Sequence, residues 1–220
     1  METYLTIFWL TLRVGLFSTT LCLPFAILIG YALARHRVPL PSLIRAMISL
    51  PMVMPPVAVG LALLWFFGTK SPLAPLWQWL GVEMIFTPSA AVIAAAVVGF
   101  PLLARSAEQS FAAIDSSYEE MARTLGASPV ATFFRVSLPL ARRGLLYGSL
   151  LCFARALGEF GATAVIAGII PERTETLSLG IWSRIQLGDD QGAGILVGLS
   201  FILALASMLV AERWLRPGPK

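Results

Sequence analysis

Apolar residues are gathered into five long runs separated by short polar segments. The runs cover residues 9–34, 46–67, 88–107, 144–170 and 193–214. A helix needs roughly 20 mostly apolar residues to cross the hydrocarbon core of a bilayer, and each run is long enough. The pattern therefore predicts an all-α integral membrane protein with five transmembrane helices in a single domain, residues 1–220.

The second run contains a cluster of prolines. Pro51, Met54, Pro55 and Pro56 stand close together, and prolines at this spacing remove backbone hydrogen bonds, which predicts a kinked or unwound segment. Irregular backbone at membrane depth persists only where protein or a water-filled cavity surrounds it. Two interpretations stay open: these residues line a translocation pathway at a dimer axis, or they form an ordinary proline-rich turn.

The fourth run carries two opposite charges. Arg155 and Glu159 are four residues apart, so on a helix they share one face and can pair. Charges at this depth are costly and face a protein interior or an aqueous cavity, which leaves open an internal salt bridge or a role beside a translocation path. The same run also contains small residues, which predict a smooth helix face that a helix from a second copy of the chain could approach closely. These residues are Ala154, Gly158, Gly161, Val165 and Gly168.

The polar segment 115–139 is predicted to form two short helices joined at a glycine. Ser117 followed by Glu120 fits a capping box, and Gly126 supplies the left-handed position that would end the first helix. Ser128 and Pro129 fit the cap and first residue of the second helix. That helix would carry an apolar stripe and end at a proline; these residues are Val130, Phe133, Phe134 and Pro139.

Composition and charge narrow the class of protein. The chain is 57% hydrophobic and 13% charged, with a mean hydropathy of +0.80, so the lipid bilayer is its main solvent. Its arginines flank apolar runs instead of forming a basic face, which argues against a nucleic-acid partner. Cys22 and Cys152 lie within apolar runs and His36 is the single histidine. Neither a disulfide framework, nor a metal site, nor a catalytic triad is therefore expected.

Basic residues also predict the orientation in the membrane. They concentrate after the first run, around segment 105–143 and at the C-terminus, where the residues include Arg213, Arg216 and Lys220. Because cytoplasmic loops carry the excess of Lys and Arg, segment 115–139 and the C-terminus are expected in the cytoplasm. The N-terminus is then expected outside.

Segment 115–139 resembles the cytoplasmic signature loop of ABC-importer permeases. That loop reads Glu-Ala-Ala, three residues, Gly, nine residues, Ile, one residue, Leu-Pro. Every spacing holds in this chain, with Met and Val replacing the second position and the Ile; the residues are Glu120, Met121, Ala122, Gly126, Val136, Leu138 and Pro139. The proline run of 51–60 and the segment 153–163 are similar to molybdate permeases and to sulfate and thiosulfate permeases. An amphipathic helix lying on the inner membrane face is the alternative interpretation of segment 115–139.

The resemblance implies a type I importer permease fold that works as a homodimer in a bacterial inner membrane. It also implies two ATP-binding cassette subunits on the cytoplasmic loops and an extracytoplasmic oxyanion-binding protein. The substrate would be molybdate, with tungstate, sulfate and thiosulfate as alternatives. The loop residues expected to couple to the ATPase are Glu119, Glu120, Ala122, Arg123, Gly126, Ala127, Phe133, Phe134, Val136, Leu138 and Pro139.

The sequence offers no phosphate-binding loop of its own. A Walker A loop needs Gly before its Lys-Ser or Lys-Thr pair, but Thr69 precedes Lys70 and Ser71. We therefore expect the chain to be no enzyme and to bind no cofactor, with ATP and Mg²⁺ held by the partner ATPase. Ion-coupled secondary transport is the alternative of another class. It usually relies on ionisable relays in the membrane, and Arg155 and Glu159 are the one such pair here.

Overall fold

The computed structural model describes residues 2–81 and 83–215, and within them the secondary structure consists of helices joined by turns, with no strand. The all-α prediction is confirmed. The helices are α1 (Glu2–Ala34), α2 (Pro41–Val53), α3 (Pro56–Phe67), α4 (Ala74–Trp79), α5 (Pro88–Ala112), α6 (Ser116–Thr124), α7 (Pro129–Thr132), the π-helical turn η1 (Phe133–Ser137), α8 (Leu138–Leu157), α9 (Gly161–Ile166), α10 (Leu177–Gln186) and α11 (Asp190–Leu215).

Among the described residues, three single helices are long and apolar enough to cross a membrane: α1, α5 and the 190–210 part of α11. The second run is broken as its prolines predicted, because α2 and α3 meet at 109°. Pro55 and Pro56 stand at this bend, where Pro56 begins α3 without needing a backbone N–H donor. Counting the bent pair as one span gives up to four spans.

The prediction of one continuous fourth helix over 144–170 is wrong. Helix α8 ends at Leu157, the chain turns at residues 158–160, and α9 is only six residues long. Helix α8 is also less apolar than a typical membrane-spanning helix, because it carries Arg142, Arg143 and Arg155. The predicted count of five transmembrane helices is therefore not confirmed in the described residues.

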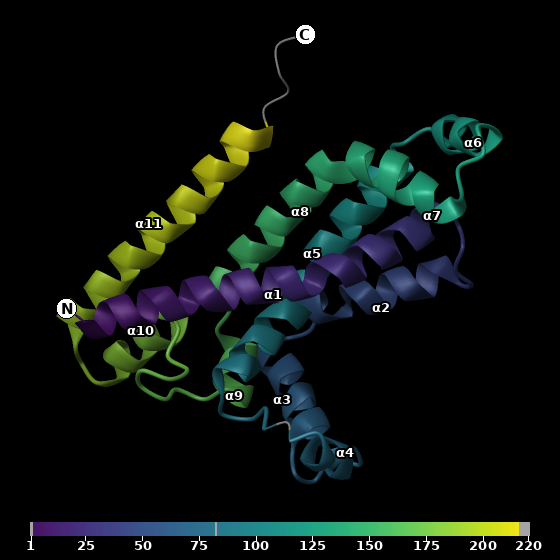
Figure 1. The fold of residues 1–220 in the computed structure, drawn as a ribbon. Helices are drawn as coiled ribbons and strands as arrows, with labels where there is room; N and C mark the ends of the chain where they lie inside the picture. Colours follow the sequence, from purple (N-terminus) through teal and green to yellow (C-terminus); the bar gives the residue numbers. More distant parts are fainter. Residues whose placement is uncertain (1, 82, 216–220) are drawn as a thin grey trace.

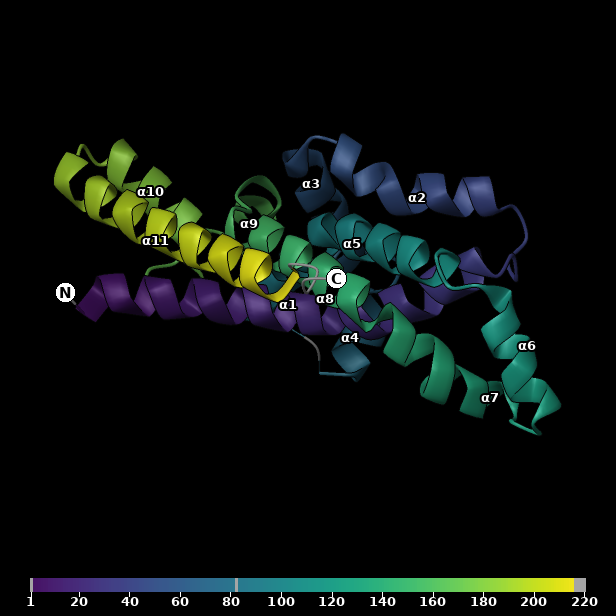
Figure 2. The same cartoon turned by 90° about the horizontal axis from the view of Figure 1, so that it is seen from above.

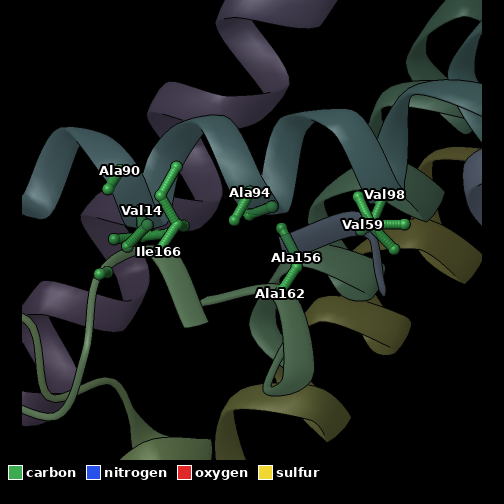
Figure 3. Packing of buried hydrophobic residues seen from close by; sticks show 11 residues of the cluster. Val14, Val59, Ala90, Ala94, Val98, Ala156, Ala162 and Ile166 are labelled. Atoms are coloured by element: carbon green, nitrogen blue, oxygen red, sulfur yellow. The ribbon is translucent and has the colours of Figure 1, made fainter. Parts of the chain in front are cut away.

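The core forms where α1, α5 and α8 pack along one another, with α5 in the middle (Figures 1 and 2). Alanines on α5 allow the close packing, and Ala90 and Ala94 are fully buried. Figure 3 shows these alanines facing Val14 of α1 and Ile166 of α9 within one apolar cluster. Small side chains on a central helix let its neighbours approach closely, which is how membrane helices gain packing contacts.

The small-residue face of the fourth run packs within the chain, at α3. A Cβ atom on Gly161 would lie 2.9 Å from Pro56 Cβ, and one on Gly60 of α3 would lie 2.7 Å from the Ala162 carbonyl oxygen. At Gly161 the partner is therefore α3 of the same chain, and the expectation that a second copy fills this face is wrong at that residue. Gly158, by contrast, meets nothing within 4 Å.

The molecule is elongated, and its two ends differ (Figure 2). Helices α6 and α7 lie at one end, beside the C-terminal end of α1 and the start of α2. The N-terminus, α10 and the start of α11 lie at the other end (Figure 1). The segment predicted to couple to a partner thus forms a separate projection from the bundle.

Candidate functional site

The first helix of the loop begins two residues earlier than the capping box predicted, and its cap is Asp115. Asp115 Oδ1 accepts the backbone N–H of Ser117 at 2.9 Å, and this hydrogen bond holds the pKa of Asp115 below its ordinary value. The capping box of Ser117 and Glu120 is therefore wrong: Ser117 lies inside the helix. Glu120 is exposed. A carboxylate at the cap satisfies the same free N–H groups that a serine would.

The glycine between the two helices behaves as predicted. Gly126 has φ of 86° and follows the C-cap Leu125. The N–H of Ala127 donates to the Ala122 carbonyl, and the N–H of Gly126 donates to the Arg123 carbonyl, which together form a Schellman motif. A Cβ at Gly126 would meet nothing within 4 Å, so the requirement for glycine comes from the backbone conformation alone.

The second loop helix starts as predicted but does not end where predicted. Ser128 Oγ accepts the N–H of Ala131, and Pro129 is the first helical residue. Pro139 does not terminate the helix, because the chain widens into η1 and continues into α8, of which Pro139 is the second residue. Pro139 has no backbone N–H to donate. The chain accommodates it because the helix widens just before it into a π turn, in which the N–H of Leu138 donates to the Phe133 carbonyl.

The central residue of the loop is Glu119, which is buried with only 4% of its surface exposed. Its Oε1 accepts hydrogen bonds from Arg35 Nη2 at 2.8 Å and from Ser137 Oγ at 2.8 Å. Its Oε2 accepts the hydroxyl of Tyr31 at 3.3 Å and lies 3.8 Å from Arg123 Nη2. One carboxylate therefore ties α6 to the end of α1 and to η1.

Electrostatics keep this carboxylate ionised. Burial by itself raises the pKa of Glu119, but the hydrogen bonds from Arg35 and Ser137 and the charge of Arg35 outweigh it, so the pKa lies below its ordinary value. Arg35 also donates to the Ile114 carbonyl at 3.2 Å, which fixes the turn between α5 and α6. The result is a charged anchor inside the loop.

The roles of Arg35, Tyr31 and Ser137 were not predicted. From the sequence, Arg35 was considered only as one of the basic residues that follow the first apolar run and indicate the orientation in the membrane. A usable signal exists, because Tyr31 and Arg35 are four residues apart at the end of the first apolar run and so share one helical face. Nothing in the sequence pattern, however, identified Glu119 instead of Glu120 as their partner.

The predicted apolar stripe of the second helix is divided between two sides. Phe133 packs inward on Tyr31, with ring centroids 4.9 Å apart, and on Phe111. Phe134 and Val130 are exposed, at 60% and 66%. They extend an outward apolar surface of the loop whose other members are Tyr118, Met121 and Leu125.

The other loop residues of the signature lie between these two sides. Ala122, Ala127, Val136 and Leu138 are half-buried, whereas Pro139 is exposed. Leu138 packs against the buried cluster formed by α1, α5 and α8. The signature spacing thus places some residues inward for docking on the bundle and others outward.

The charged pair of the fourth run is confirmed and lies at the break. Arg155 Nη2 is 2.8 Å from Glu159 Oε2. Glu159 is 3% exposed, and its Oε1 accepts the N–H of Ala162 at 2.9 Å, so the same carboxylate satisfies a donor at the start of α9. Ser178 Oγ of α10 donates to the Glu159 carbonyl. These contacts favour the interpretation of Arg155 and Glu159 as an internal salt bridge over a role beside a translocation path.

A second buried acid lies in the segment after α9. Glu175 is 1% exposed and lies 3.4 Å from Arg184 Nη1 of α10. The neighbouring Leu177 donates its N–H to Thr11 Oγ1 of α1 at 2.8 Å. The burial of this segment against α1 was not predicted from the sequence.

Of the proline cluster, Met54 and Pro55 form the bend between α2 and α3. Pro51 faces an apolar groove beside α1 and α5, and Pro56 packs on Gly161. Among the described residues no group of three or more His, Cys, Asp or Glu side chains could hold a metal ion.

The chain resembles known permease subunits over nearly its whole length. Residues 24–220 match the family described as "Binding-protein-dependent transport system inner membrane component". The molybdenum transport system permease protein ModB of Escherichia coli K12 is 38% identical over 94% of this chain and 90% of its own length, and that of Haemophilus influenzae is 41% identical over the same shares.

A sulfate relative and a solved structure complete the comparison. The sulfate transport system permease protein CysW of Synechococcus elongatus is 35% identical over 93% of this chain and 73% of its own length. A structure titled as inward facing conformations of the MetNI methionine ABC transporter superimposes with a TM-score of 0.70. It covers 98% of this chain and 94% of that one at 19% identity, which is a likeness of fold.

Proposed function

The chain belongs to the family of binding-protein-dependent transport system inner membrane components and is a permease subunit of an ABC importer, and from that premise we propose that it imports molybdate. The observation that supports this substrate is the set of relatives named for molybdenum transport, at 38% and 41% identity over 94% of the chain. Sulfate is the second candidate, favoured by the 35% identical sulfate permease. Tungstate and thiosulfate belong to the same class of tetrahedral oxyanions.

We propose that α6, α7 and η1 form the surface on which an ATPase subunit docks. The outward apolar residues Tyr118, Met121, Leu125, Val130 and Phe134 suit burial in a groove of a partner protein. The Glu119 anchor supports this role, since a loop that transmits motion must be stiff with respect to the bundle. The cofactors ATP and Mg²⁺ are assigned to that partner.

The complete machine contains two copies of this chain, two ATPase subunits and an extracytoplasmic oxyanion-binding protein. The basic residues around segment 105–143 favour placing α6 and α7 in the cytoplasm and the N-terminus outside. Arg216 and Lys220, which also entered that argument, lie outside the described residues. Because the chain belongs to this importer family, we propose transport driven by a partner ATPase instead of ion-coupled transport.

The test of the substrate is uptake of labelled molybdate by cells that lack this chain, with and without the restored gene. Loss of uptake that is restored by the gene, with competition by tungstate but not by excess sulfate, supports molybdate. Unchanged molybdate uptake together with a sulfate defect would move the chain to the sulfate branch of the same importer family.

A further inference from the structure

An apolar groove runs along the bundle and is lined by α1, α2 and α5, with α5 packed against both of the other helices and lying between them in Figure 2. Its volume is about 560 Å³, and its walls include Phe25 of α1, Met47 and Pro51 of α2, and Phe100 of α5. A second hollow of about 690 Å³ continues it between α1 and α5 as far as Pro88, and the two share Phe25. No lining residue of either part is charged.

The groove has the length of one lipid chain. Its α5 wall runs from Pro88 to Phe100, which is about 18 Å at 1.5 Å per helical residue. Half the hydrocarbon core of a bilayer is about 15 Å thick. An extended acyl chain of one leaflet therefore matches both the length and the apolar lining.

A charged cluster lies where the groove ends toward α6. Arg45 is two residues before Met47 on α2, and its Nε donates to Glu108 Oε1 at 2.6 Å. Arg105 Nη1 donates to Glu108 Oε2 at 3.2 Å. Glu108 is 9% exposed, whereas the side chains of Arg45 and Arg105 are 31% and 43% exposed.

The cluster has a net charge of +1 and donors to spare. Each guanidinium has five N–H groups, and among the described residues each is recorded with a single hydrogen bond, to Glu108. The buried carboxylate therefore holds both guanidinium groups in place, and their partly exposed side chains keep further N–H groups available to an anionic ligand. Arginine in this arrangement suits a phosphate group.

We propose that the groove and the cluster together bind one anionic phospholipid. Its phosphate contacts Arg45 and Arg105, and its acyl chain lies in the groove against Phe25, Met47 and Phe100. A free oxyanion would contact the arginines but not the apolar groove. An uncharged partner would contact the groove but would not pair with the arginines. Basic pockets between membrane helices with an adjoining apolar surface are the sites where anionic headgroups bind. The site is independent of which oxyanion is transported.

The test compares phosphatidylglycerol with phosphatidylcholine of identical acyl chains, added to the purified complex of this chain with its ATPase in detergent. Bound lipid is counted by native mass spectrometry, and thermal unfolding is followed in parallel. We expect phosphatidylglycerol to bind and to raise the unfolding temperature, because a ligand of the folded state stabilises it. Inorganic phosphate is the control for a free anion and should do neither.

The decisive variant is Arg45→Gln with Arg105→Gln. It should bind phosphatidylglycerol about thirtyfold more weakly, at about fivefold for each arginine. The matched control is Arg142→Gln with Arg143→Gln, two exposed arginines of α8 away from the groove, which should keep wild-type affinity. If the decisive variant does not fold, Arg45→Lys with Arg105→Lys replaces it and should bind measurably more weakly than wild type.

Three results would overturn the proposal. The first is equal binding of the two lipids by the wild-type complex, and the second is unchanged phosphatidylglycerol binding by the arginine variants. The third concerns a second copy of the chain as the occupant. If Phe25→Cys in one copy forms a disulfide with Met47→Cys in another within membranes, the groove is a protein interface.

Discussion

Replacing Glu119 with glutamine is expected to loosen the α6–α7 loop while the membrane helices remain folded. The side chains of Glu119 and Arg35 are 5% and 14% exposed, so solvent screens their interaction little. Glutamine keeps one oxygen, which can replace Oε1 and accept from Arg35 and Ser137, but its amide nitrogen cannot replace Oε2 as the acceptor for Tyr31. It also removes the negative charge, so the loss is roughly that of one charge-assisted hydrogen bond. Such a bond contributes about 2 kcal/mol, which corresponds to about a thirtyfold larger population of the undocked loop.

The measurement is amide hydrogen exchange of α6 in the purified chain reconstituted in lipid nanodiscs. Exchange of residues 116–124 should become about thirtyfold faster in Glu119→Gln, because local opening limits exchange. The matched control is Glu120→Gln, the next residue along, which is exposed and should leave loop exchange unchanged. Equal exchange rates in the two variants would refute the assignment of Glu119 as the anchor.

The same anchor predicts a dependence on pH. The pKa of Glu119 is lowered from its ordinary value of 4.5, because the hydrogen bonds from Arg35 and Ser137 outweigh the effect of burial. A lowered pKa in the folded state gives stability that is fully present above pH 4.5 and is lost as the pH falls through the folded-state pKa. Loop exchange, corrected for its intrinsic rate, should therefore rise in acid in the wild type. That rise should be smaller in Glu119→Gln, in which only the Asp115 cap of α6 still loses stabilising charge in acid.

Other substitutions test the remaining contacts. Gly60→Ala should separate α3 from α9 and destabilise the chain by about 1–3 kcal/mol, whereas Gly158→Ala, which meets open space, should be neutral in the same thermal unfolding assay. Gly126→Ala should cost about 1–2 kcal/mol through its left-handed backbone alone, seen as reduced co-purification of the ATPase. Arg155→Gln with Glu159→Gln should fold better than either single variant and keep the wild-type KM for uptake, whereas a raised KM would indicate a pathway role.

Much of the fold follows from the sequence because the bilayer makes length and apolarity decisive. The runs 9–34, 88–107 and 193–214 correspond to α1, α5 and α11. The helices extend beyond the predicted ends, at most by seven residues at the start of α1. The bend at Pro55 also followed from local chemistry, since proline removes a donor wherever it stands. These features depend on residues close together in the chain.

Two of the errors have the opposite origin, because they depend on residues that are distant in the chain. The break after Leu157 has no proline, and it is held by contacts of Glu159 with Arg155, Ala162 and Ser178 of α10. A helical pattern across residues 144–170 cannot reveal it, because its stabilising partner comes from a later helix. The assignment of Glu119 depends in the same way on Arg35, 84 residues earlier in the chain.

Buried charge in this permease is concentrated at the joints between helices. The four buried acidic residues of the described chain are Glu108, Glu119, Glu159 and Glu175, and each lies within 3.4 Å of an arginine. Glu119 joins α6 to α1, and Glu159 joins α8 to α9 across the break. Breaking such a pair leaves a buried charge without a partner. Each pair therefore holds two neighbouring segments of the chain in a fixed relation to each other.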